Sequence, residues 1–448
     1  MPFLKHDRIT PAQVVILGFL FQILIGACLL SLPVATQSGE RVPFLDALFT
    51  ATSATCVTGL VIHDTALFWS PFGQGVILLL IQVGGMGVVT MAVAIFMFSG
   101  RKIGLKQRWV MQESISAPQV GGIVRMTGFI LKTAFLIEAI GALLLALRFC
   151  PQFGLGKGIW YGIFHAVSAF CNAGFDLMGE TGAFSSLTGY VGDPLVNLVI
   201  CLLIVVGGLG FLTWHDVAAH GRHVSQYRLQ SKLILLTTLA LLVGGFLFFR
   251  FYEFSRPQWV ALTGGEQGLA ALFQSVSPRT AGFNTVDLTQ LSACSQLMTI
   301  LLMLAGGSPG STAGGFKTTT LAVLLLSVGA VIRRQGSARC FGRRLPDQVL
   351  RNACAIFLLY LLLFLAGGML ICCMDEIPLM QALFEAASAI GTVGLSLGAT
   401  AEASEASRLI LIFLMYFGRV GGLTMIYAMA AGSNGASSQY PQEQVTVG

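Results

Sequence analysis

One short phrase occurs four times along this chain of 448 residues, each time between two long apolar runs. Each copy has a phenylalanine, a serine four residues later and a glycine five or six residues after the serine. The copies lie about 110 residues apart, and a repeat of this kind predicts four equivalent units around one axis. They are Phe49, Ser53 and Gly59; Phe164, Ser168 and Gly174; Phe273, Ser277 and Gly282; and Phe384, Ser388 and Gly394.

Each copy predicts a short helix followed by extended backbone. A phenylalanine and a serine four residues apart lie on one face of a helix. The glycine that follows permits a positive φ angle, and the residues around it are mostly small or hydroxyl-bearing. We therefore expect four half-length helices, each leading into an irregular segment.

The composition places these units in a membrane. With 55% hydrophobic residues, 10% charged residues and a mean hydropathy of +0.79, the chain has more apolar sequence than a soluble core can bury. Several apolar runs reach the ~20 residues that span a bilayer, and we expect the first to be retained as a membrane helix. The predicted runs are 12–32, 74–98, 127–147, 194–213, 230–251, 295–332, 352–373 and 407–430.

These runs predict an all-α integral membrane protein with eight transmembrane helices and four half-helices. The expected architecture is four tandem repeats of helix, pore loop and helix around a central pore. The predicted repeats are residues 1–110, 111–220, 221–345 and 346–448.

Basic residues gather between the repeats and near the N-terminus, and they account for 16 of the 26 lysines and arginines. The positive-inside rule makes these stretches and both termini cytoplasmic. The net charge of +6 is therefore interpreted as a topology signal and not as a nucleic-acid site. The residues are Lys5, Arg8, Arg101, Lys102, Lys106, Arg108, Arg125, Arg222, Arg228, Lys232, Arg333, Arg334, Arg339, Arg343, Arg344 and Arg351.

Acidic residues gather in the segments that enclose the repeated phrases. A surface of this sign raises the local concentration of cations at a pore mouth, although many of these side chains are also explained as solvated loop charges. The residues are Glu40, Asp46, Asp64, Asp176, Glu180, Asp193, Glu253, Glu266, Asp287, Asp375, Glu376, Glu402 and Glu405.

The repeated phrases predict a cation pathway. Irregular backbone at membrane depth is tolerated only where protein buries it or where it lines a water-filled cavity. A half-helix that ends near the bilayer centre points its carbonyl end, which carries about half a negative charge, at that cavity. Rings of backbone carbonyls can then replace the hydration shell of a potassium ion.

The phrases ATSATCVTGL at 51–60, AVSAFCNAGF at 166–175, SVSPRTAGFN at 275–284 and AASAIGTVGL at 386–395 resemble those of the Ktr/Trk/HKT superfamily of potassium transporters. The short N-terminus resembles the KtrB-type membrane subunit most. The resemblance implies K⁺ at backbone carbonyls near the four glycines, and glycine in the first phrase implies preference over Na⁺. The implied selectivity filter is Thr55, Cys56, Val57, Thr58, Gly59, Cys171, Asn172, Ala173, Gly174, Thr280, Ala281, Gly282, Gly391, Thr392, Val393 and Gly394.

A second feature is the segment AGGSPGSTAGGFKTTT at 305–320, inside an apolar run. Its five glycines and proline break any helix, which predicts an irregular loop within the membrane. It resembles the intramembrane gating loop of the superfamily. The implied gating residues are Gly306, Gly307, Ser308, Pro309, Gly310, Ser311, Thr312, Ala313, Gly314, Gly315 and Lys317, with Arg419 of the last helix.

Two enzyme motifs also match this segment in part. A phosphate-binding loop needs a different spacing before Lys317 and a preceding strand, and a GxSxG nucleophile needs a strand and histidine and acid partners. Neither context is present in the sequence, so we expect no enzyme and no organic cofactor. Arg419 is a guanidinium at membrane depth, which must face water or carbonyls. Arg279 lies within the third phrase, where it either anchors the loop or takes part in permeation, and Glu138 and Lys132 are interpreted as helix partners.

The sequence thus predicts the potassium-translocating subunit of a Ktr-type uptake system in the cell (inner) membrane. The resemblance implies a homodimer on a cytosolic, nucleotide-binding ring of RCK-type regulatory subunits, a partner domain that this sequence lacks. The alternatives are a TrkH-type potassium transporter, a sodium- and potassium-permeable secondary transporter, and a non-transporting scaffold. Whether Na⁺ is co-transported or only activates stays open at this point.

Overall fold

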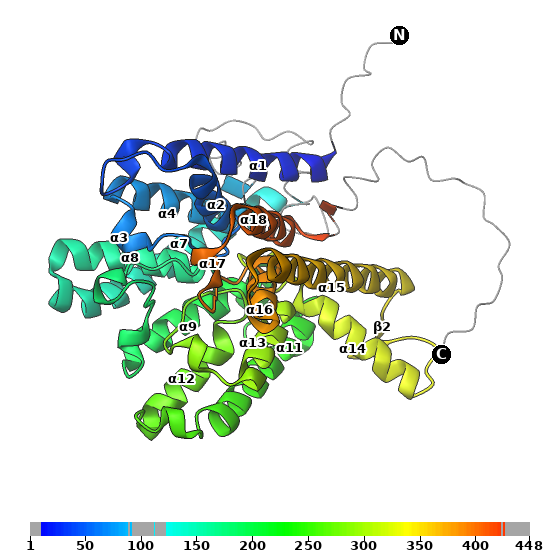
Figure 1. The fold of residues 1–448 in the computed structure, drawn as a ribbon. Coiled ribbons are helices and arrows are strands. Elements are labelled where there is room, and N and C mark those ends of the chain that lie inside the picture. The colour runs from blue at the N-terminus through cyan, green and yellow to red at the C-terminus, as the bar shows by residue number, and fades with distance from the viewer. Residues whose placement is uncertain (1–9, 88–89, 92–111, 113–121, 423, 426–448) are drawn as a thin grey trace, which may run out of the picture.

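The computed structural model describes residues 10–87, 90–91, 112, 122–422 and 424–425, and these are mostly helical (Figure 1). The prediction of an all-α membrane protein is confirmed. Four of the described helices are long and apolar enough to cross a bilayer, or five if the bent pair α9 and α10 counts as one span. The four are α1 (Pro11–Leu30), α7 (Ile123–Phe153), α11 (Leu229–Phe248) and α15 (Asp347–Asp375).

Each long helix leads into a half-length helix and then a second apolar helix. The half-length helices are α2 (Phe44–Thr55), α8 (Leu155–Phe170), α12 (Gly264–Val276) and α16 (Leu379–Gly391). The second helices are α4 (Pro71–Met86), α9 (Pro194–Gly208), α13 (Ala293–Ala305) and α18 (Glu405–Val420). The other α-helices and strands of the described residues are α3 (Thr65–Phe68), α10 (Phe211–His220), α14 (Thr318–Ile332), α17 (Ala399–Glu402) and a hairpin of β1 (Arg339–Cys340) and β2 (Arg343–Arg344).

All four second helices begin at a side-chain cap. The N-cap residues are Ser70, Asp193, Ser292 and Ser404, and each accepts a hydrogen bond from a backbone N–H in the first turn. A cap of this kind satisfies a donor that has no partner inside the helix. The repeated cap fixes the residue at which each second helix begins after the irregular segment that precedes it.

A glycine with positive φ lies at or just beyond the end of all four second helices: it is the C-cap of α4, α13 and α18, and the second residue after α9. The angles are +86° at Gly87, +90° at Gly210, +53° at Gly306 and +90° at Gly421. The expectation of continuous helices over 74–98, 194–213 and 407–430 is therefore wrong at these points; parts of 74–98 and of 407–430 lie outside the described residues. A helix interior cannot continue through such a φ angle. The axes of α9 and α10 differ by 97° across the break at Gly210.

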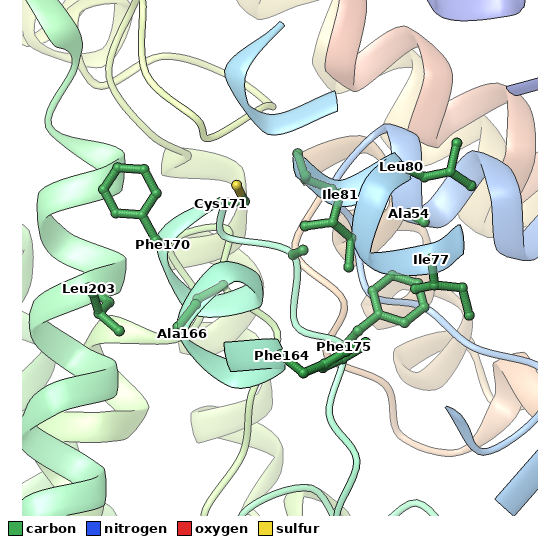
Figure 2. Close-up of a cluster of buried hydrophobic side chains, with 14 of the residues drawn as sticks. Ala54, Ile77, Leu80, Ile81, Phe164, Ala166, Phe170, Cys171, Phe175 and Leu203 are labelled. Atoms are coloured by element: carbon green, nitrogen blue, oxygen red, sulfur yellow. The ribbon is translucent and has the colours of Figure 1, made fainter. Parts of the chain in front are cut away.

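The half-length helices are buried by the helices around them. The phenylalanines of the four phrases, Phe49, Phe164, Phe273 and Phe384, are 0% exposed. Figure 2 shows this packing around α8, with Phe164 beside Phe175 and Phe170 on the side of Leu203 in α9. Burying an aromatic side chain stabilises the fold by a few kcal/mol, so the phenylalanine fixes the position of each half-length helix.

The last repeat packs on the first. In Figure 1 helix α18 lies beside α2, and the Arg408 guanidinium donates to Asp46 at 2.8 Å across 362 residues of sequence. His63 lies 3.0 Å from the other oxygen of the same carboxylate. The Tyr416 hydroxyl also donates to the Ile16 carbonyl at 2.8 Å. The arrangement of units is therefore closed, as four equivalent units around one axis require.

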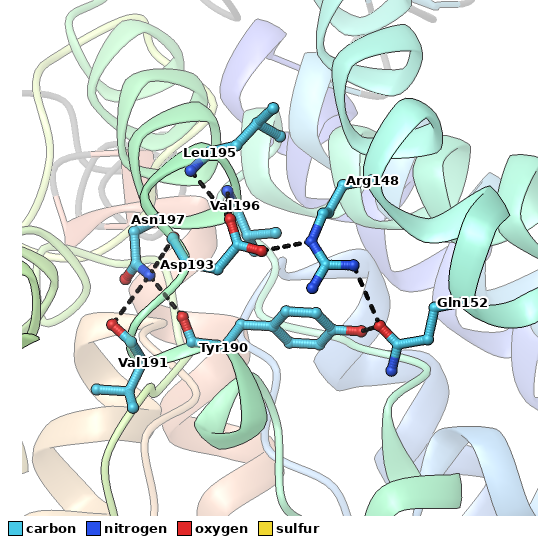
Figure 3. A network of polar contacts seen from close by, with 8 residues as sticks. All are labelled: Arg148, Gln152, Tyr190, Val191, Asp193, Leu195, Val196 and Asn197. Atoms are coloured by element: carbon cyan, nitrogen blue, oxygen red, sulfur yellow. Dashed lines mark hydrogen bonds and ion pairs between the residues drawn. The ribbon is translucent and has the colours of Figure 1, made fainter.

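A polar network joins α7 to the start of α9 (Figure 3). Arg148 donates to Asp193 at 2.5 Å, and the same carboxylate caps α9. The Tyr190 hydroxyl donates to Gln152 at 2.8 Å, and the Asn197 amide donates to the Tyr190 carbonyl at 2.7 Å. This network holds the connection between the second irregular segment and α9 against the long helix.

We expect Arg408→Ala to lower the free energy of unfolding by about 2 kcal/mol, because Asp46 is then left partly buried with a weaker partner. The measurement is the melting temperature of purified protein in detergent. Arg351→Ala is the matched control, since Arg351 is exposed on α15 and contacts Gln348. Equal melting temperatures for the two variants would show that this ion pair does not close the ring of units.

Candidate functional site: a ring of four glycines above an intramembrane loop

The glycines of the four phrases share one backbone conformation. Their φ angles are +92° at Gly59, +70° at Gly174, +83° at Gly282 and +96° at Gly394. In this region an L side chain is strained, so glycine is the residue that fits. The prediction of a short helix followed by irregular backbone is thus met in all four units.

The residue two positions before each glycine also has a positive φ, although none of these residues is glycine. The angles are +51° at Val57, +58° at Asn172, +71° at Thr280 and +49° at Thr392. Three of the four are β-branched, for which this conformation is a genuine outlier that costs on the order of 1–3 kcal/mol. Strain repeated at four equivalent positions indicates a functional backbone shape.

The four glycines form a closed ring. A Cβ placed on Gly59 would lie 2.4 Å from the Ala173 carbonyl oxygen, and one placed on Gly174 would lie 2.7 Å from that of Ala281. The same holds from Gly282 to Val393, at 2.4 Å, and from Gly394 back to Thr58, at 2.2 Å. We call these glycines, with the carbonyl-bearing residue before each, the glycine ring. Its members are too close for any side chain at these four positions.

The serine of each phrase anchors the glycine ring. In all four units the backbone N–H of the residue before the glycine donates to the serine carbonyl, at 2.7 to 2.9 Å. The hydroxyls act in two ways. Those of Ser53 and Ser388 accept from the N–H of their own glycine at 3.0 Å, and those of Ser168 and Ser277 donate to the carbonyl of Phe175 and of Phe283.

A cavity of about 400 Å³ opens on one face of the glycine ring and contains all four glycines in its wall. We call it the acidic cavity, because each unit contributes one carboxylate to its lining: Asp64, Asp176, Asp287 and Glu402. Partial burial alone would raise the pKa of Asp287, but hydrogen bonds from Thr289 and Gln290 outweigh it and hold the pKa below its usual value. This carboxylate is therefore ionised at neutral pH and attracts cations.

After α13 the chain runs irregularly through 306–317 before α14 begins, and we call this segment the intramembrane loop. Its residues Pro309, Gly310, Ser311, Ala313, Gly315, Phe316 and Lys317 line a second cavity of about 310 Å³, the loop cavity. Thr312 and Gly314 instead contact the ends of half-length helices and the segments after them. The loop thus stands between these segments and the loop cavity.

Close approach fixes the loop in place. A Cβ on Gly314 would lie 2.2 Å from the Thr392 hydroxyl, and one on Gly315 would lie 2.6 Å from the Gly391 carbonyl. The loop N–H of Ser308 donates to Gly208 at 3.1 Å, and the loop carbonyl of Gly310 accepts from Phe211 at 2.7 Å. The loop therefore fills the break between α9 and α10 and touches the fourth unit.

Two basic side chains line the loop cavity. The Arg419 guanidinium donates to the Thr312 carbonyl of the loop and to the Gly84 and Gly85 carbonyls at the end of α4. The Lys317 ammonium donates to the carbonyls of Ala313 and Gly314 at 2.9 and 3.0 Å. Arg419 therefore joins the loop to another unit, whereas Lys317 closes the loop on itself.

The residues expected in the filter do not all face one another. Thr55 and Gly391 are the last residues of α2 and α16, and the ring itself starts beyond them. The Cys171 thiol lies 3.9 Å from Glu138, among helices. The hydroxyls of Thr58 and Thr392 are buried and have no hydrogen-bond partner within the described part of the chain. The structure thus brings the four glycines and the residue before each of them together in one ring, and it places the Cys171 side chain elsewhere.

Two sets of residues at the site are not predicted from the sequence. Gly84, Gly207 and Gly418 let second helices approach the ends of half-length helices, since a Cβ there would lie 2.0 to 2.2 Å from a carbonyl oxygen of Thr55, Phe170 or Ile390. The signal was a second glycine three residues later in each case. The other set follows each phenylalanine and is polar in all four phrases: Thr50, His165, Gln274 and Glu385.

Two members of that second set support the chain beyond the glycine ring. The Glu385 carboxylate accepts from the Ser396 hydroxyl at 2.6 Å and from the Leu397 N–H at 2.9 Å. The His165 ring accepts from the Leu177 N–H at 3.3 Å and lies 2.7 Å from the Tyr161 carbonyl. Glu385 and His165 thus connect two half-length helices to the segments that follow the glycine ring, and these segments form part of the wall of the acidic cavity.

Comparison with known proteins agrees with this geometry. The family model of the TrkH cation transport proteins matches residues 22–440. The chain is 40% identical to the potassium/sodium uptake protein NtpJ of Enterococcus hirae and 40% identical to the Ktr system potassium uptake protein B of Bacillus subtilis, in each case over 99% of this chain and 98% of the relative.

Among solved structures, the potassium transporter TrkH from Vibrio parahaemolyticus has the same fold. The TM-score is 0.72 at 20% sequence identity, over 95% of this chain and 85% of that one. The matching family is one of cation transport proteins and not of enzymes. Four half-length helices, a closed glycine ring and full-length relatives lead to one conclusion: the chain belongs to the TrkH family of cation transport proteins.

Proposed function

We propose that this chain is the potassium-translocating membrane subunit of a Ktr-type uptake system. The observation that carries the proposal is the closed glycine ring beside the acidic cavity, since four carbonyl-bearing segments at one point can replace the water around a cation. The relatives named as potassium uptake proteins support K⁺ as the cargo. Selectivity comes from the backbone of the four segments, and no enzymatic step or organic cofactor is involved.

The intramembrane loop is the proposed gate, with Arg419 and Lys317 as its basic supports. It lies where an ion that has passed the ring must enter the loop cavity, and two positive charges in that cavity oppose a cation. The membrane potential drives transport, at ~2.3 kcal/mol per charge for each 100 mV. An open state then requires the loop to leave the segments it contacts.

The proposed setting is the cell membrane, with both termini and the basic stretches in the cytoplasm. The exposed arginines at the end of α14 and in the β1–β2 hairpin, Arg333, Arg334, Arg343 and Arg344, suit that side. We propose a homodimer that binds a cytosolic, nucleotide-binding RCK-type ring, because a relative is named as protein B of a Ktr system. The four repeats of the proposed function are residues 1–110, 111–220, 221–345 and 346–448, with the gate inside the third.

A second candidate is a transporter that carries sodium as well as potassium. The printed name of the Enterococcus hirae relative, a potassium/sodium uptake protein, favours it. The other alternative is a TrkH-type potassium transporter. All three candidates share the glycine ring, and the second differs from the other two in the ions that cross it.

Uptake of potassium by a bacterial strain that lacks its own uptake systems tests the function. We expect growth at low external potassium when the chain is expressed with a Ktr regulatory subunit, and uptake of potassium rather than sodium in flux assays with each ion alone. The empty vector is the control. Equal uptake of both ions would favour the second candidate, and no uptake of either ion would reject transport.

A further inference from the structure

One side chain connects the intramembrane loop to the glycine ring. Thr312 is 0% exposed, and its hydroxyl donates to the Phe170 carbonyl at 3.0 Å. Phe170 is the last residue of α8, so this carbonyl lies at the helix end that points toward the ring. The same hydroxyl lies 3.3 Å from the terminal amide of Asn172, and the Thr312 N–H donates to Gly207 at 3.3 Å.

The contact continues into two ring segments. The Asn172 amide and the Thr280 hydroxyl are 3.2 Å apart, and with its oxygen toward Thr280 the amide nitrogen also reaches the carbonyls of Phe170 and Ile204. Asn172 and Thr280 are the positive-φ residues two positions before Gly174 and Gly282. A change at Thr312 therefore acts on strained backbone in the second and third units.

The opposite side of the same residue is tied to the loop cavity. The Thr312 carbonyl accepts from Arg419, whose guanidinium also donates to the end of α4. Thr312 is thus bound through its carbonyl to the arginine and through its hydroxyl to the ring segments. Strained φ angles persist only where surrounding contacts hold them, and these contacts are lost when the loop moves.

We propose that Thr312 is a positioning residue that makes ion selectivity depend on the position of the intramembrane loop. While the loop is in place, the Thr312 hydroxyl holds Phe170 and Asn172 and keeps the ring segments of units two and three in their narrow geometry. When the loop leaves, these segments relax and the ring discriminates less between potassium and sodium. This inference rests on the proposed roles of the ring and the loop.

The test measures the ratio of potassium to sodium uptake in Thr312→Val, which keeps the shape of the side chain and removes the hydroxyl. We expect the ratio to fall about fivefold, the factor that one ordinary net hydrogen bond contributes. Thr312→Ser should restore it. The matched control is Thr127→Val, because Thr127 is equally buried and its hydroxyl donates within α7 to Ile123. Thr312→Ala replaces the valine variant if the latter does not reach the membrane.

A double variant separates this inference from the proposed function. If Arg419→Gln releases the loop, adding Thr312→Val to it should not change the ratio further, because the hydroxyl has already left its partners. A wild-type ratio in Thr312→Val together with raised flux in Arg419→Gln would overturn the coupling and leave the gate intact. Wild-type behaviour of all three variants would instead reject the loop as a gate.

Discussion

Gly59→Ser should let sodium compete with potassium, with a loss of selectivity of tenfold or more. The new Cβ would lie 2.4 Å from the Ala173 carbonyl oxygen, and the residue would have to keep a φ angle of +92°. One segment of the ring must move, which changes the distances between carbonyls that set the preference for an ion. About 1.4 kcal/mol of lost discrimination gives the tenfold effect. Competition between the two ions in uptake assays measures it.

Gly39→Ser is the matched control for this experiment. Gly39 also has a positive φ, +73°, but it is exposed and nothing lies within 4 Å of the position of its Cβ. The control therefore introduces the same backbone strain away from the ring. Unchanged ion competition in Gly59→Ser, in protein that reaches the membrane in normal amount, would rule out the glycine ring as the selectivity filter.

Arg419→Gln should raise potassium flux and make it less dependent on a regulatory subunit. The substitution removes hydrogen bonds from a charged donor to the loop and to α4, and each such bond contributes about 1.5–3 kcal/mol. Loss of one shifts the balance between the closed and open loop by about tenfold or more toward open. It also removes a positive charge from the loop cavity. Initial rates of uptake with and without the subunit are the measurement.

Arg419→Lys separates the two effects of this arginine. Lysine keeps the charge but lacks the planar guanidinium, whose several N–H donors reach the carbonyls of Thr312, Gly84 and Gly85 at the same time. If repulsion of the ion dominates, the lysine variant transports like the wild type; if the hydrogen bonds dominate, it transports like Arg419→Gln. Arg351→Gln, on the exposed face of α15, is the control. Wild-type flux in both Arg419 variants would assign this residue to helix packing alone.

The sequence predicts the local features of this fold because they depend on local residue order. The repeated phrases mark the four half-length helices and the glycines with positive φ, and the glycine and proline content of 306–317 marks the irregular loop. The apolar runs around them show where membrane helices lie. In each case the signal is a backbone preference or a length, which needs no knowledge of neighbouring segments.

What the sequence does not predict depends on contacts between distant segments. The end of α9 at Gly208 follows an apolar run that would continue as a helix, and at this break Gly208 and Phe211 bond to Ser308 and Gly310 of the intramembrane loop. The serines of the repeated phrases act as hydrogen-bond acceptors in two units and as donors in the other two, and this difference depends on which backbone group lies next to each hydroxyl. The two contacts of the Thr312 hydroxyl join residues 140 or more positions apart, a separation at which periodicity carries no information.

The breaks in the second helices suggest how a gate can arise without a new fold. In the second unit the helix resumes only two residues after α9 ends, whereas in the third unit residues 306–317 separate α13 from α14. Lengthening a connection that already exists costs little conformational entropy, about 0.6 kcal/mol for each doubling of its length. A longer connection in one unit can therefore serve as a barrier, while the short connection in the second unit leaves the space that the longer one occupies.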